Sequence, residues 1–287
     1  MSSSLTSRLL LIAAAVLFST GGAAIKATTL SGWQVAGSRS AVAAIALLLL
    51  VPAARKGWSW RVLPAGAAYA STLILFVLSN KLTTAANAIF LQSTAPLFLL
   101  LIGPLLLKEA IHRSDIPLIA GVATGMAMFF AGTEPSRMTA PDPVRGNELA
   151  ALSGLTWGLT IAGLRWMGRR SEGKGSMATV VAGNLLVCAA AAPLAAPILT
   201  LTMRDVAAIA YLGVVQIGLA YWCLTRAIRH VPALEAATLI LLEPVLNPIW
   251  TWLLHGERPS LWAIAGGSLI LGATLFNVYL KARQRRG

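Results

Sequence analysis

The chain has 287 residues, of which 57% are hydrophobic and only 11% charged, and its mean hydropathy is +0.74. Soluble domains carry roughly 25% charged residues, so these values exclude a water-soluble globule and a disordered chain. They are typical of a membrane protein with many helical spans and no separate soluble domain. Unbroken apolar runs such as residues 41–51 disfavour an outer-membrane barrel, because barrel strands alternate apolar with polar residues.

Apolar segments of about 20 residues, the length of a membrane-spanning helix, follow one another between breaks rich in proline, glycine and charge. In chain order they predict ten helices, over residues 8–30, 33–54, 62–79, 83–107, 115–132, 147–168, 176–198, 205–224, 233–254 and 261–281. The longest break divides the chain near its middle. We therefore expect a first five-helix unit in residues 1–132, a linker in residues 133–146, and a second five-helix unit with a short basic tail in residues 147–287.

The 23 Lys and Arg residues are distributed unevenly over this pattern. With the N-terminus inside, 16 of them fall on the inner side and 7 on the outer side. Because cytoplasmic loops are enriched in Lys and Arg, the bias predicts a multi-pass protein of a bacterial-type cytoplasmic (inner) membrane. Both termini are then cytoplasmic and the linker 133–146 is extracytoplasmic. The same bias accounts for the net charge of +13 without a nucleic-acid partner.

The two units share a pattern of residues. The matching positions are Pro96 with Pro244 and Glu109 with Glu257, at an offset of 148 residues, and Phe18-Ser19 with Trp157-Gly158, at an offset of 139. Because each predicted unit has an odd number of helices, the second must enter the membrane with the opposite orientation. Such inverted repeats are typical of carriers that bind a substrate between the repeats and open alternately to the two sides of the membrane.

On these paired residues and on the segment Gly256-Glu257-Arg258, the whole chain resembles the ten-span drug/metabolite transporter superfamily with its EamA-type repeats. Within that superfamily it is most similar to the YddG-type exporters of aromatic amino acids. The resemblance implies an all-α integral membrane protein with two inverted five-helix repeats around a central cavity. It also implies a secondary transporter, not driven by ATP, that exports small amphipathic metabolites such as amino acids, including aromatic ones. One departure is Lys108-Glu109, where the second unit has Gly256-Glu257.

The most informative polar residue is Glu243, near the middle of the ninth predicted helix. A carboxylate at membrane depth is costly unless it faces a water-filled cavity or a partner. Pro244 and Pro248 free backbone carbonyl groups near it, and Asn247 lies one helical turn further on the same face. Two interpretations stay open: Glu243 binds the substrate or relays protons, or it is a structural carboxylate paired with Arg39.

Other polar and aromatic residues at membrane depth complete the expected substrate-binding cavity. The full set is Phe18, Ser19, Asn87, Gln92, Trp157, Asn184, Gln216, Tyr221, Glu243 and Asn247. Pro96 and Pro244 are expected to be hinges, because a proline cannot donate a hydrogen bond to the preceding helical turn. The small-residue runs 121–125 and 266–272 predict close helix packing, either within the chain or in a homodimer.

Signatures of other functions are missing from the sequence. There is no phosphate-binding Walker loop, and His112, His230 and His255 stand apart without the spacing of a metal site. No catalytic residue, metal or cofactor is therefore expected, and the expected partners are a small-molecule substrate and the lipid bilayer. The alternatives are an exporter of other small metabolites or drugs and, from a different class, a lipid-active membrane enzyme. The oligomeric state, monomer or homodimer, stays open.

Overall fold

The computed structural model describes residues 3–106, 111–132, 135–171, 175–195, 200–227, 230–231 and 233–284. Over these residues every regular element is a helix, and the only β contact is an isolated bridge between Arg137 and Ala140. Residues 133–134 of the predicted linker, residues 285–287 of the basic tail and the repeat position Glu109 lie outside the described residues. The expectation of an all-α protein is confirmed for the part of the chain that the structure describes.

Each of the ten predicted ranges contains one helix or several helices in succession. The first half forms α1 (Ser3–Ser19), α2 (Gly21–Lys26), α3 (Gly32–Leu50), η1 (Pro52–Arg55), α4 (Val62–Leu82), α5 (Ala85–Gln92), α6 (Ala95–Leu106), η2 (Arg113–Asp115) and α7 (Ile116–Ala131). The second half forms α8 (Pro143–Ser171), α9 (Ser176–Ala195), α10 (Met203–Ala210), the π-helical segment η3 (Tyr211–Leu219), α11 (Ala220–Ala227), α12 (Ala233–Ile240), α13 (Leu242–His255) and α14 (Leu261–Gln284).

Within the described residues, 7 helical segments are long and apolar enough to cross a membrane. They are Leu5–Lys26, Gly32–Leu50, Val62–Leu82, Ala85–Leu105, Ser176–Ala195, Met203–Ala227 and Leu261–Lys281, and the shorter helix Ile116–Ala131 is also apolar. The helix α8 and the pair α12 and α13, which occupy the other predicted ranges, are not among the seven. A membrane protein with several helical spans is therefore confirmed, while the number of ten spans stays a prediction.

Helix breaks lie directly before the two prolines that were expected to be hinges. The helix α5 ends at Gln92 and α6 begins at Ala95, so Pro96 occupies the first turn of α6. In the second half α12 ends at Ile240 and α13 begins at Leu242, so Pro244 occupies the first turn of α13. Proline is tolerated in a first turn because its missing N–H has no partner there in any case. Both expected hinge prolines therefore adjoin a helix break, and their role as hinges stays a prediction.

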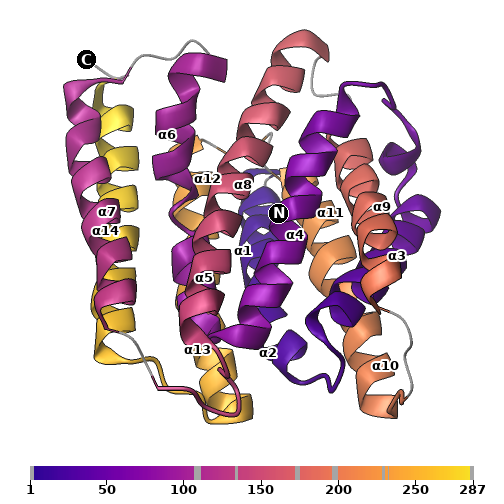
Figure 1. Cartoon of the computed structure of the whole chain (residues 1–287). Helices are drawn as coiled ribbons and strands as arrows, with labels where there is room; N and C mark the ends of the chain where they lie inside the picture. Colours follow the sequence, from indigo (N-terminus) through magenta and orange to yellow (C-terminus); the bar gives the residue numbers. More distant parts are fainter. Residues whose placement is uncertain are drawn as a thin grey trace.

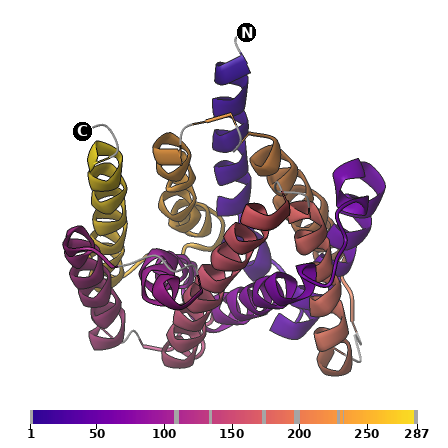
Figure 2. The same cartoon turned by 90° about the horizontal axis from the view of Figure 1, so that it is seen from above.

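Helices α7 and α14 lie side by side at one edge of the molecule, and α3, α9 and α10 lie at the opposite edge (Figure 1 and Figure 2). Between them α4 packs against both α8 and α9. One hydrophobic core joins the two halves and includes Ile25, Tyr69 and Phe90 from the first half and Val181 and Leu212 from the second. Because the halves share this core, residues far apart in the sequence come together between them.

Glycines allow α7 and α14 to approach closely. A Cβ atom added at Gly125 would lie 2.8 Å from the backbone oxygen of Gly266, and one added at Gly121 would lie 2.6 Å from the Cβ atom of Ala273. Both distances are too short for a side chain, so the small residues are required at this contact. The predicted close packing of the two small-residue runs is therefore found within the chain.

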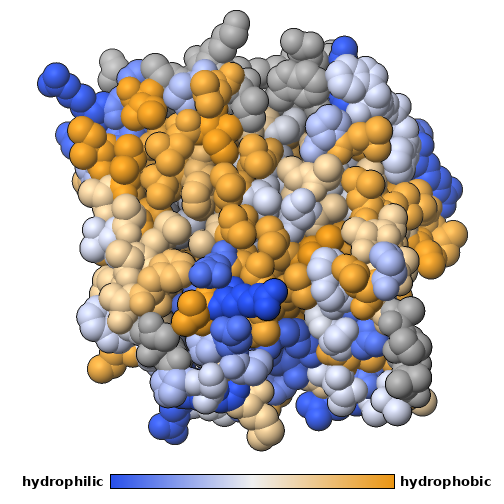
Figure 3. All heavy atoms as spheres, in the orientation of Figure 1, coloured by the Kyte–Doolittle hydropathy of each residue, from blue (hydrophilic) through white to orange (hydrophobic). Residues whose placement is uncertain are grey.

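The described surface exposes many large apolar side chains. In Figure 3 apolar side chains cover much of the upper and middle part of the face, while hydrophilic ones gather in its lower part, where Figure 1 places α2 and α10, and at its left and right edges. Large apolar side chains are strongly exposed, among them Leu50 at 71%, Leu105 at 84% and Leu261 at 83%. Extended apolar surface of this kind is unfavourable in water but suits contact with the hydrocarbon chains of a bilayer.

Candidate functional site

Helix ends from both halves of the chain meet around a buried ion pair. Lys26 Nζ lies 3.0 Å from Glu257 Oε2, and the two side chains are only 4% and 3% exposed. Lys26 also donates hydrogen bonds to the backbone oxygens of Thr83 and Thr139. Glu257 Oε1 accepts one from the backbone N–H of Ala85 at 2.6 Å. These contacts tie α2, α5 and α13 together, and we call the region around Lys26 and Glu257 the Lys26 end.

Other charged side chains at the Lys26 end are also partnered. Asp205 accepts hydrogen bonds from the backbone N–H and the hydroxyl of Thr29 at 2.7 and 2.8 Å, and from the hydroxyl of Thr202 at 2.6 Å. Lys81 donates to the backbone oxygen of Thr28 at 2.8 Å. The segment that follows α2 is thereby fixed to α10 and to the end of α4. This end of the molecule is held together by polar contacts between the two halves.

Three aromatic rings from different helices meet between the two halves. The ring of Tyr221 on α11 lies 5.0 Å from that of Phe18 on α1, at an interplanar angle of 74°, and 5.6 Å from that of Tyr69 on α4, at 81°. Edge-to-face pairs of this kind are favourable beyond the burial of their area. The three residues combine apolar ring surface with two phenol hydroxyl groups, and we call them the aromatic cluster.

Arg39, on α3, is buried beside this cluster, with only 1% of the residue exposed. Its Nη2 atom donates a hydrogen bond to the backbone oxygen of Leu73 at 3.3 Å, and its Nε atom is buried without a partner. Tyr69 and Tyr221 lie within electrostatic reach of the guanidinium group. Among the described residues no acid forms an ion pair with it. The pairing of Arg39 with Glu243, one of the two interpretations of Glu243, is therefore not present in this conformation.

Two more buried polar atoms, one in the aromatic cluster and one next to it, lack hydrogen-bond partners among the described residues. The hydroxyl of Tyr69 lies near Tyr221 and Asn184 without the geometry of a hydrogen bond to either. Asn184 donates from Nδ2 to the backbone oxygen of Val180 at 2.8 Å, but its Oδ1 atom is unpartnered among the described residues. A buried polar group without a partner costs about 1–3 kcal/mol. A group of such atoms therefore indicates a place where a ligand or water binds.

Glu243 lies on the other side of the interface between the halves, in the first turn of α13. It is half-buried, makes no ion pair with the described residues, and interacts electrostatically with the phenol of Tyr221. Asn247, one turn further, is fully buried, and neither polar atom of its side chain has a partner there. A Cβ atom at Gly22 would approach the Oδ1 atoms of Asn247 and Asn80 to 2.8 and 3.1 Å, so both oxygens face Gly22.

Two other predicted cavity residues border the aromatic cluster. The hydroxyl of Ser19 accepts a hydrogen bond from Trp250 Nε1 at 2.9 Å, which joins α1 to α13. Gln216, on the π-helical segment, donates from Nε2 to the backbone oxygen of Phe18 at 3.5 Å. These contacts connect the last two residues of α1, Phe18 and Ser19, with η3 and α13 respectively. Seven of the ten predicted residues therefore lie at or near the aromatic cluster: Phe18, Ser19, Asn184, Gln216, Tyr221, Glu243 and Asn247.

The remaining three predicted residues lie on α5 and α8. Asn87 is buried and donates to Asn147 Oδ1 at 3.1 Å, an oxygen that also accepts from the hydroxyl of Thr83. Gln92 is half-buried at the end of α5, and Trp157 is half-buried against the main hydrophobic core. The described contacts of Asn87 therefore tie α5 to α8 rather than to the aromatic cluster, and its part in substrate binding stays a prediction.

Tyr69, Asn80 and Trp250 were not predicted from the sequence as site residues, and Arg39 was predicted only as a possible partner of Glu243. The available signal was the presence of polar groups inside apolar helices, which are rare at membrane depth unless they face the bundle interior. Arg39 is the one charged residue within α3, and Tyr69 and Asn80 interrupt the apolar sequence of α4. Their proximity to Tyr221 and Asn247 followed only from the tertiary structure.

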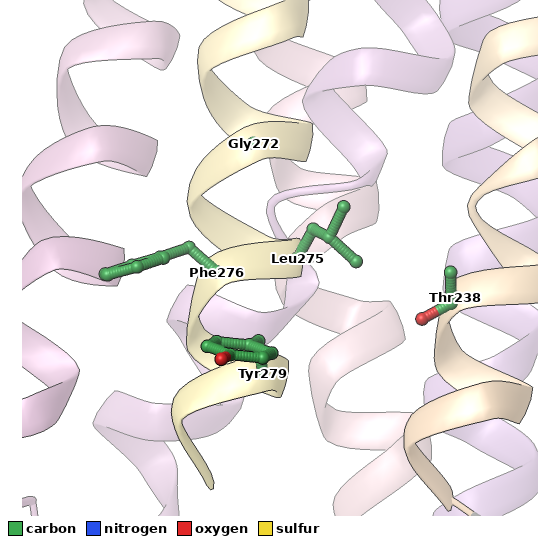
Figure 4. Close-up of a pocket in the computed structure, with 5 residues that line it drawn as sticks. All are labelled: Thr238, Gly272, Leu275, Phe276 and Tyr279. Atoms are coloured by element: carbon green, nitrogen blue, oxygen red, sulfur yellow. The ribbon is translucent and has the colours of Figure 1, made fainter. Parts of the chain in front are cut away.

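Grooves on the surface along α14 are distinct from this region. One, of about 490 Å³, lies between α12 and α14 and is lined by Thr238, Gly272, Leu275, Phe276 and Tyr279 (Figure 4). In this view Leu275 points toward Thr238, whereas Phe276 points away from it. A second lies between α13 and α14 around Trp252 and Ile264. Both are mainly apolar and contain none of the ten predicted cavity residues, so neither is the candidate site.

An acidic residue ties α7 to α14 at the end of the molecule opposite to the Lys26 end. Asp115 Oδ1 lies 2.9 Å from Lys281 Nζ and accepts a hydrogen bond from Asn277 Nδ2 at 3.1 Å. Its Oδ2 accepts one from the backbone N–H of His112 at 3.0 Å. Burial opposes ionisation of Asp115, but the bonds from His112, Lys281 and Asn277 together outweigh it and hold its pKa below the usual range.

Comparison with known proteins identifies the family. A model described as the EamA-like transporter family matches residues 5–131 and again residues 144–279. The chain belongs to this family. A solved crystal structure, described only as that of a protein, is similar to this chain over 99% of its length and 100% of the other chain, with 18% sequence identity and a TM-score of 0.65. No curated protein sequence matches the chain.

The two matches of one family model agree with a chain built from two related halves, and they place it in the drug/metabolite transporter superfamily. Members of the EamA-like family are membrane transporters of small molecules, so the small-molecule substrate and the bilayer follow for this chain as well. The similar crystal structure supports the fold alone. Within the described residues, no three His, Cys, Asp or Glu side chains come together as a metal site would require.

Proposed function

We propose that the chain is a secondary transporter that exports small amphipathic metabolites, with amino acids, including aromatic ones, as its substrates. The observation that carries this proposal is the set of groups around the aromatic cluster. The carboxylate of Glu243 and the guanidinium of Arg39 both lack ion-pair partners among the described residues, and Tyr221 is within electrostatic reach of both. Such a region offers opposite charges and apolar ring surface to one small ligand.

The region is built by both halves of the chain. Phe18, Arg39 and Tyr69 belong to the first half, whereas Tyr221 and Glu243 belong to the second. A ligand bound there would contact both, so that a relative movement of the halves would carry it. We therefore propose that residues 1–132 and 147–287 are inverted five-helix repeats that work by alternating access. The ten predicted cavity residues line the proposed path, together with Arg39 and Tyr69.

The polar contacts of the Lys26 end suggest to which side of the membrane this conformation is closed. The ion pair of Lys26 with Glu257 connects the two halves, and both side chains are buried at one end of the molecule. With both termini cytoplasmic, this end is extracytoplasmic, and the structure corresponds to a conformation closed toward the outside. The helix breaks before Pro96 and Pro244 are the proposed hinges, because the missing backbone hydrogen bonds leave the adjoining helices free to change their angle.

Substrate counterflow in liposomes that contain only this protein tests the proposed function. Vesicles loaded with unlabelled phenylalanine should accumulate radiolabelled phenylalanine from outside, without ATP, and vesicles without the protein should not. A panel of other amino acids then gives the range of substrates. Counterflow of other metabolites or drugs but of no amino acid would change the substrate class. Activity on lipid with no counterflow of any small molecule would reject transport altogether.

The orientation has its own test. Single cysteines at Ser136 and Ser171, introduced into a chain from which Cys188 and Cys223 have been removed, should differ in their reaction with an impermeant maleimide on intact cells. Position 136 should be labelled, because it belongs to the extracytoplasmic linker, and position 171 should react only after the cells are opened. The reverse pattern would contradict the orientation that the distribution of Lys and Arg predicts.

A further inference from the structure

Arg39 is a buried cation that lacks an acidic partner among the described residues. A buried ion is strongly destabilising unless an opposite charge or several hydrogen bonds compensate for its lost hydration. The neighbours of Arg39 supply one backbone oxygen, from Leu73, and two phenols, from Tyr69 and Tyr221. None of these groups carries a negative charge in its ordinary form. An anion is therefore the component that this region lacks.

Hydrogen-bond donors for an anion are already in place. The buried Nε of Arg39 and the buried hydroxyl of Tyr69 have no partners among the described residues, and the hydroxyl of Tyr221 belongs to the same aromatic cluster. Planar guanidinium and phenol donors suit a carboxylate, which has two oxygens and accepts several hydrogen bonds. Glu243 does not supply this anion, because it forms no ion pair with Arg39.

We propose that Arg39, together with the hydroxyl groups of Tyr69 and Tyr221, binds the carboxylate group of the transported molecule. This rests on the proposed function, because it assigns one part of the substrate to one part of the same site. Arg39 is 1% exposed, whereas Tyr221 is half-buried, so the carboxylate approaches from the side of Tyr221. The half-buried carboxylate of Glu243 is then free for a positively charged group on the same molecule.

A pair of ligands that differ only in this group tests the proposal. Phenylalanine has a carboxylate, whereas phenylalaninamide keeps the ring and the amino group and carries no negative charge. With the purified full-length protein, we expect phenylalanine to bind roughly tenfold more tightly or better, measured as ligand-dependent thermal stabilisation and as competition in counterflow. In Arg39→Gln this preference should disappear through loss of phenylalanine binding, and Arg39→Lys should retain part of it.

The proposal would be overturned if the Arg39→Gln variant folds and keeps the wild-type preference for phenylalanine over its amide. A stabilisation by chloride equal to that by phenylalanine would overturn it too, because the site would then hold a free anion. If phenylalanine is transported without any preference over its amide, the proposed function stands and this inference fails. If neither phenylalanine nor any other amino acid of the panel is bound or transported, both fail.

Smaller changes keep the test decisive if Arg39→Gln does not fold. Tyr69→Phe and Tyr221→Phe each remove one hydroxyl and leave the aromatic packing intact, and each should reduce the preference for phenylalanine severalfold. The matched control is Tyr211→Phe, since the hydroxyl of Tyr211 contacts Thr20 at 2.9 Å and not Arg39. It should leave the preference unchanged. An unchanged preference in both cluster variants would contradict the assignment of the carboxylate to this site.

Discussion

Lys26 and Arg39 are both buried cations of the first half of the chain, yet their surroundings differ. Lys26 has an acid at 3.0 Å and hydrogen bonds to two backbone oxygens. Arg39 has one long hydrogen bond and no acid among the described residues. A buried charge that is fully compensated stabilises a particular arrangement of helices, whereas an uncompensated one is available to a ligand. The comparison therefore distinguishes buried charged side chains that hold helices together from buried charged side chains that are available to bind a ligand.

The two acids of α13 and its C-terminal end show the same contrast. Glu257 is 6% exposed and uses both of its oxygens, on Lys26 and on the backbone of Ala85. Glu243 is half-buried and has neither an ion pair nor a hydrogen bond to the described residues, although Tyr221 is near. We expect substitutions of the first acid to change stability, and substitutions of the second to change transport.

The largest effect is expected from Glu257→Gln. It leaves the ammonium of Lys26 buried without a counter-charge, and breaking a buried pair in this way costs about 3–5 kcal/mol. The variant should therefore unfold at a clearly lower temperature in detergent, or be much less abundant in the membrane. Thermal unfolding of the purified protein, followed by the loss of soluble monodisperse protein, measures this.

The double variant Lys26→Met, Glu257→Gln is the control for that prediction. It removes both charges, so it should recover much of the stability that the single variant loses, because replacing both members of a buried pair by neutral groups is often nearly neutral. If Glu257→Gln unfolds at the wild-type temperature, the ion pair is not what holds the Lys26 end together, and the contrast with Arg39 loses its basis.

The next largest effect is expected from Glu243→Gln, in transport rather than in stability. Gln keeps the shape of Glu and removes the charge, so a substrate ammonium or a transferred proton loses its partner. Loss of a charged hydrogen bond costs about 1.5–3 kcal/mol, which is on the order of a tenfold to hundredfold loss of transport. Counterflow activity per folded protein measures it, and thermal stability should stay close to that of the wild type.

The opposite outcome for Glu243→Gln would restore the structural interpretation. Reduced stability with unaltered transport would make Glu243 a structural carboxylate, and Arg39→Gln should then resemble it. Normal transport with unaltered pH dependence would remove Glu243 from the site. Asn147→Asp provides a comparison with Glu243→Gln at a site away from the aromatic cluster. Asn147 is buried there in a polar network that joins α5, α7 and α8.

The helices themselves could be predicted because apolar runs of sufficient length and the intervening breaks are local properties of the sequence. Pro96 and Pro244 were predicted as hinges because proline removes a backbone donor. The short helix break that precedes each of them depends on packing as well, and the sequence alone did not place it. The π-helical segment Tyr211–Leu219 had no signal, because its wider turn uses the same apolar residues as an α-helix.

The candidate site was predictable in its residue types and not in its contacts. Glu243 and Tyr221 were selected because polar and aromatic groups at membrane depth are unusual, and the structure brings them close. Arg39 was equally unusual, but the sequence suggested a partner that the structure does not provide. Lys26 and Glu257 are separated by most of the chain, so no local pattern could pair them, although Glu257 had been selected as a repeat position.

A smaller effect is expected from the double variant Pro96→Ala, Pro244→Ala. Alanine restores a backbone donor next to each helix break and should favour continuous helices from α5 to α6 and from α12 to α13. Transport should fall several-fold while abundance and thermal stability change little. The separate variant Pro104→Ala, at a proline inside α6 and away from the break between α5 and α6, is the control. Unchanged transport in the double variant would leave the two helix breaks without a part in the mechanism.

The smallest effect is expected from Asp115→Asn, which removes the buried member of an ion pair whose other member is exposed. Lys281 is 47% exposed, so its ion pair with Asp115 is screened, and we expect a loss of about 1 kcal/mol at neutral pH. The pKa of Asp115 is lowered in the folded protein. Its contribution to stability is therefore fully present above the pKa of the unfolded chain, about 3.9, and is lost as the pH falls through the lower folded value.

The difference in unfolding temperature between the wild type and Asp115→Asn should accordingly be constant near neutral pH and shrink below about pH 4. The matched control is Asp142→Asn, at an exposed position whose carboxylate accepts only a backbone hydrogen bond from Arg145 within the described residues. It should change the unfolding temperature less at every pH. A difference for Asp115→Asn that grows in acid would mean that the folded protein binds the neutral acid better, and that burial rather than pairing governs Asp115.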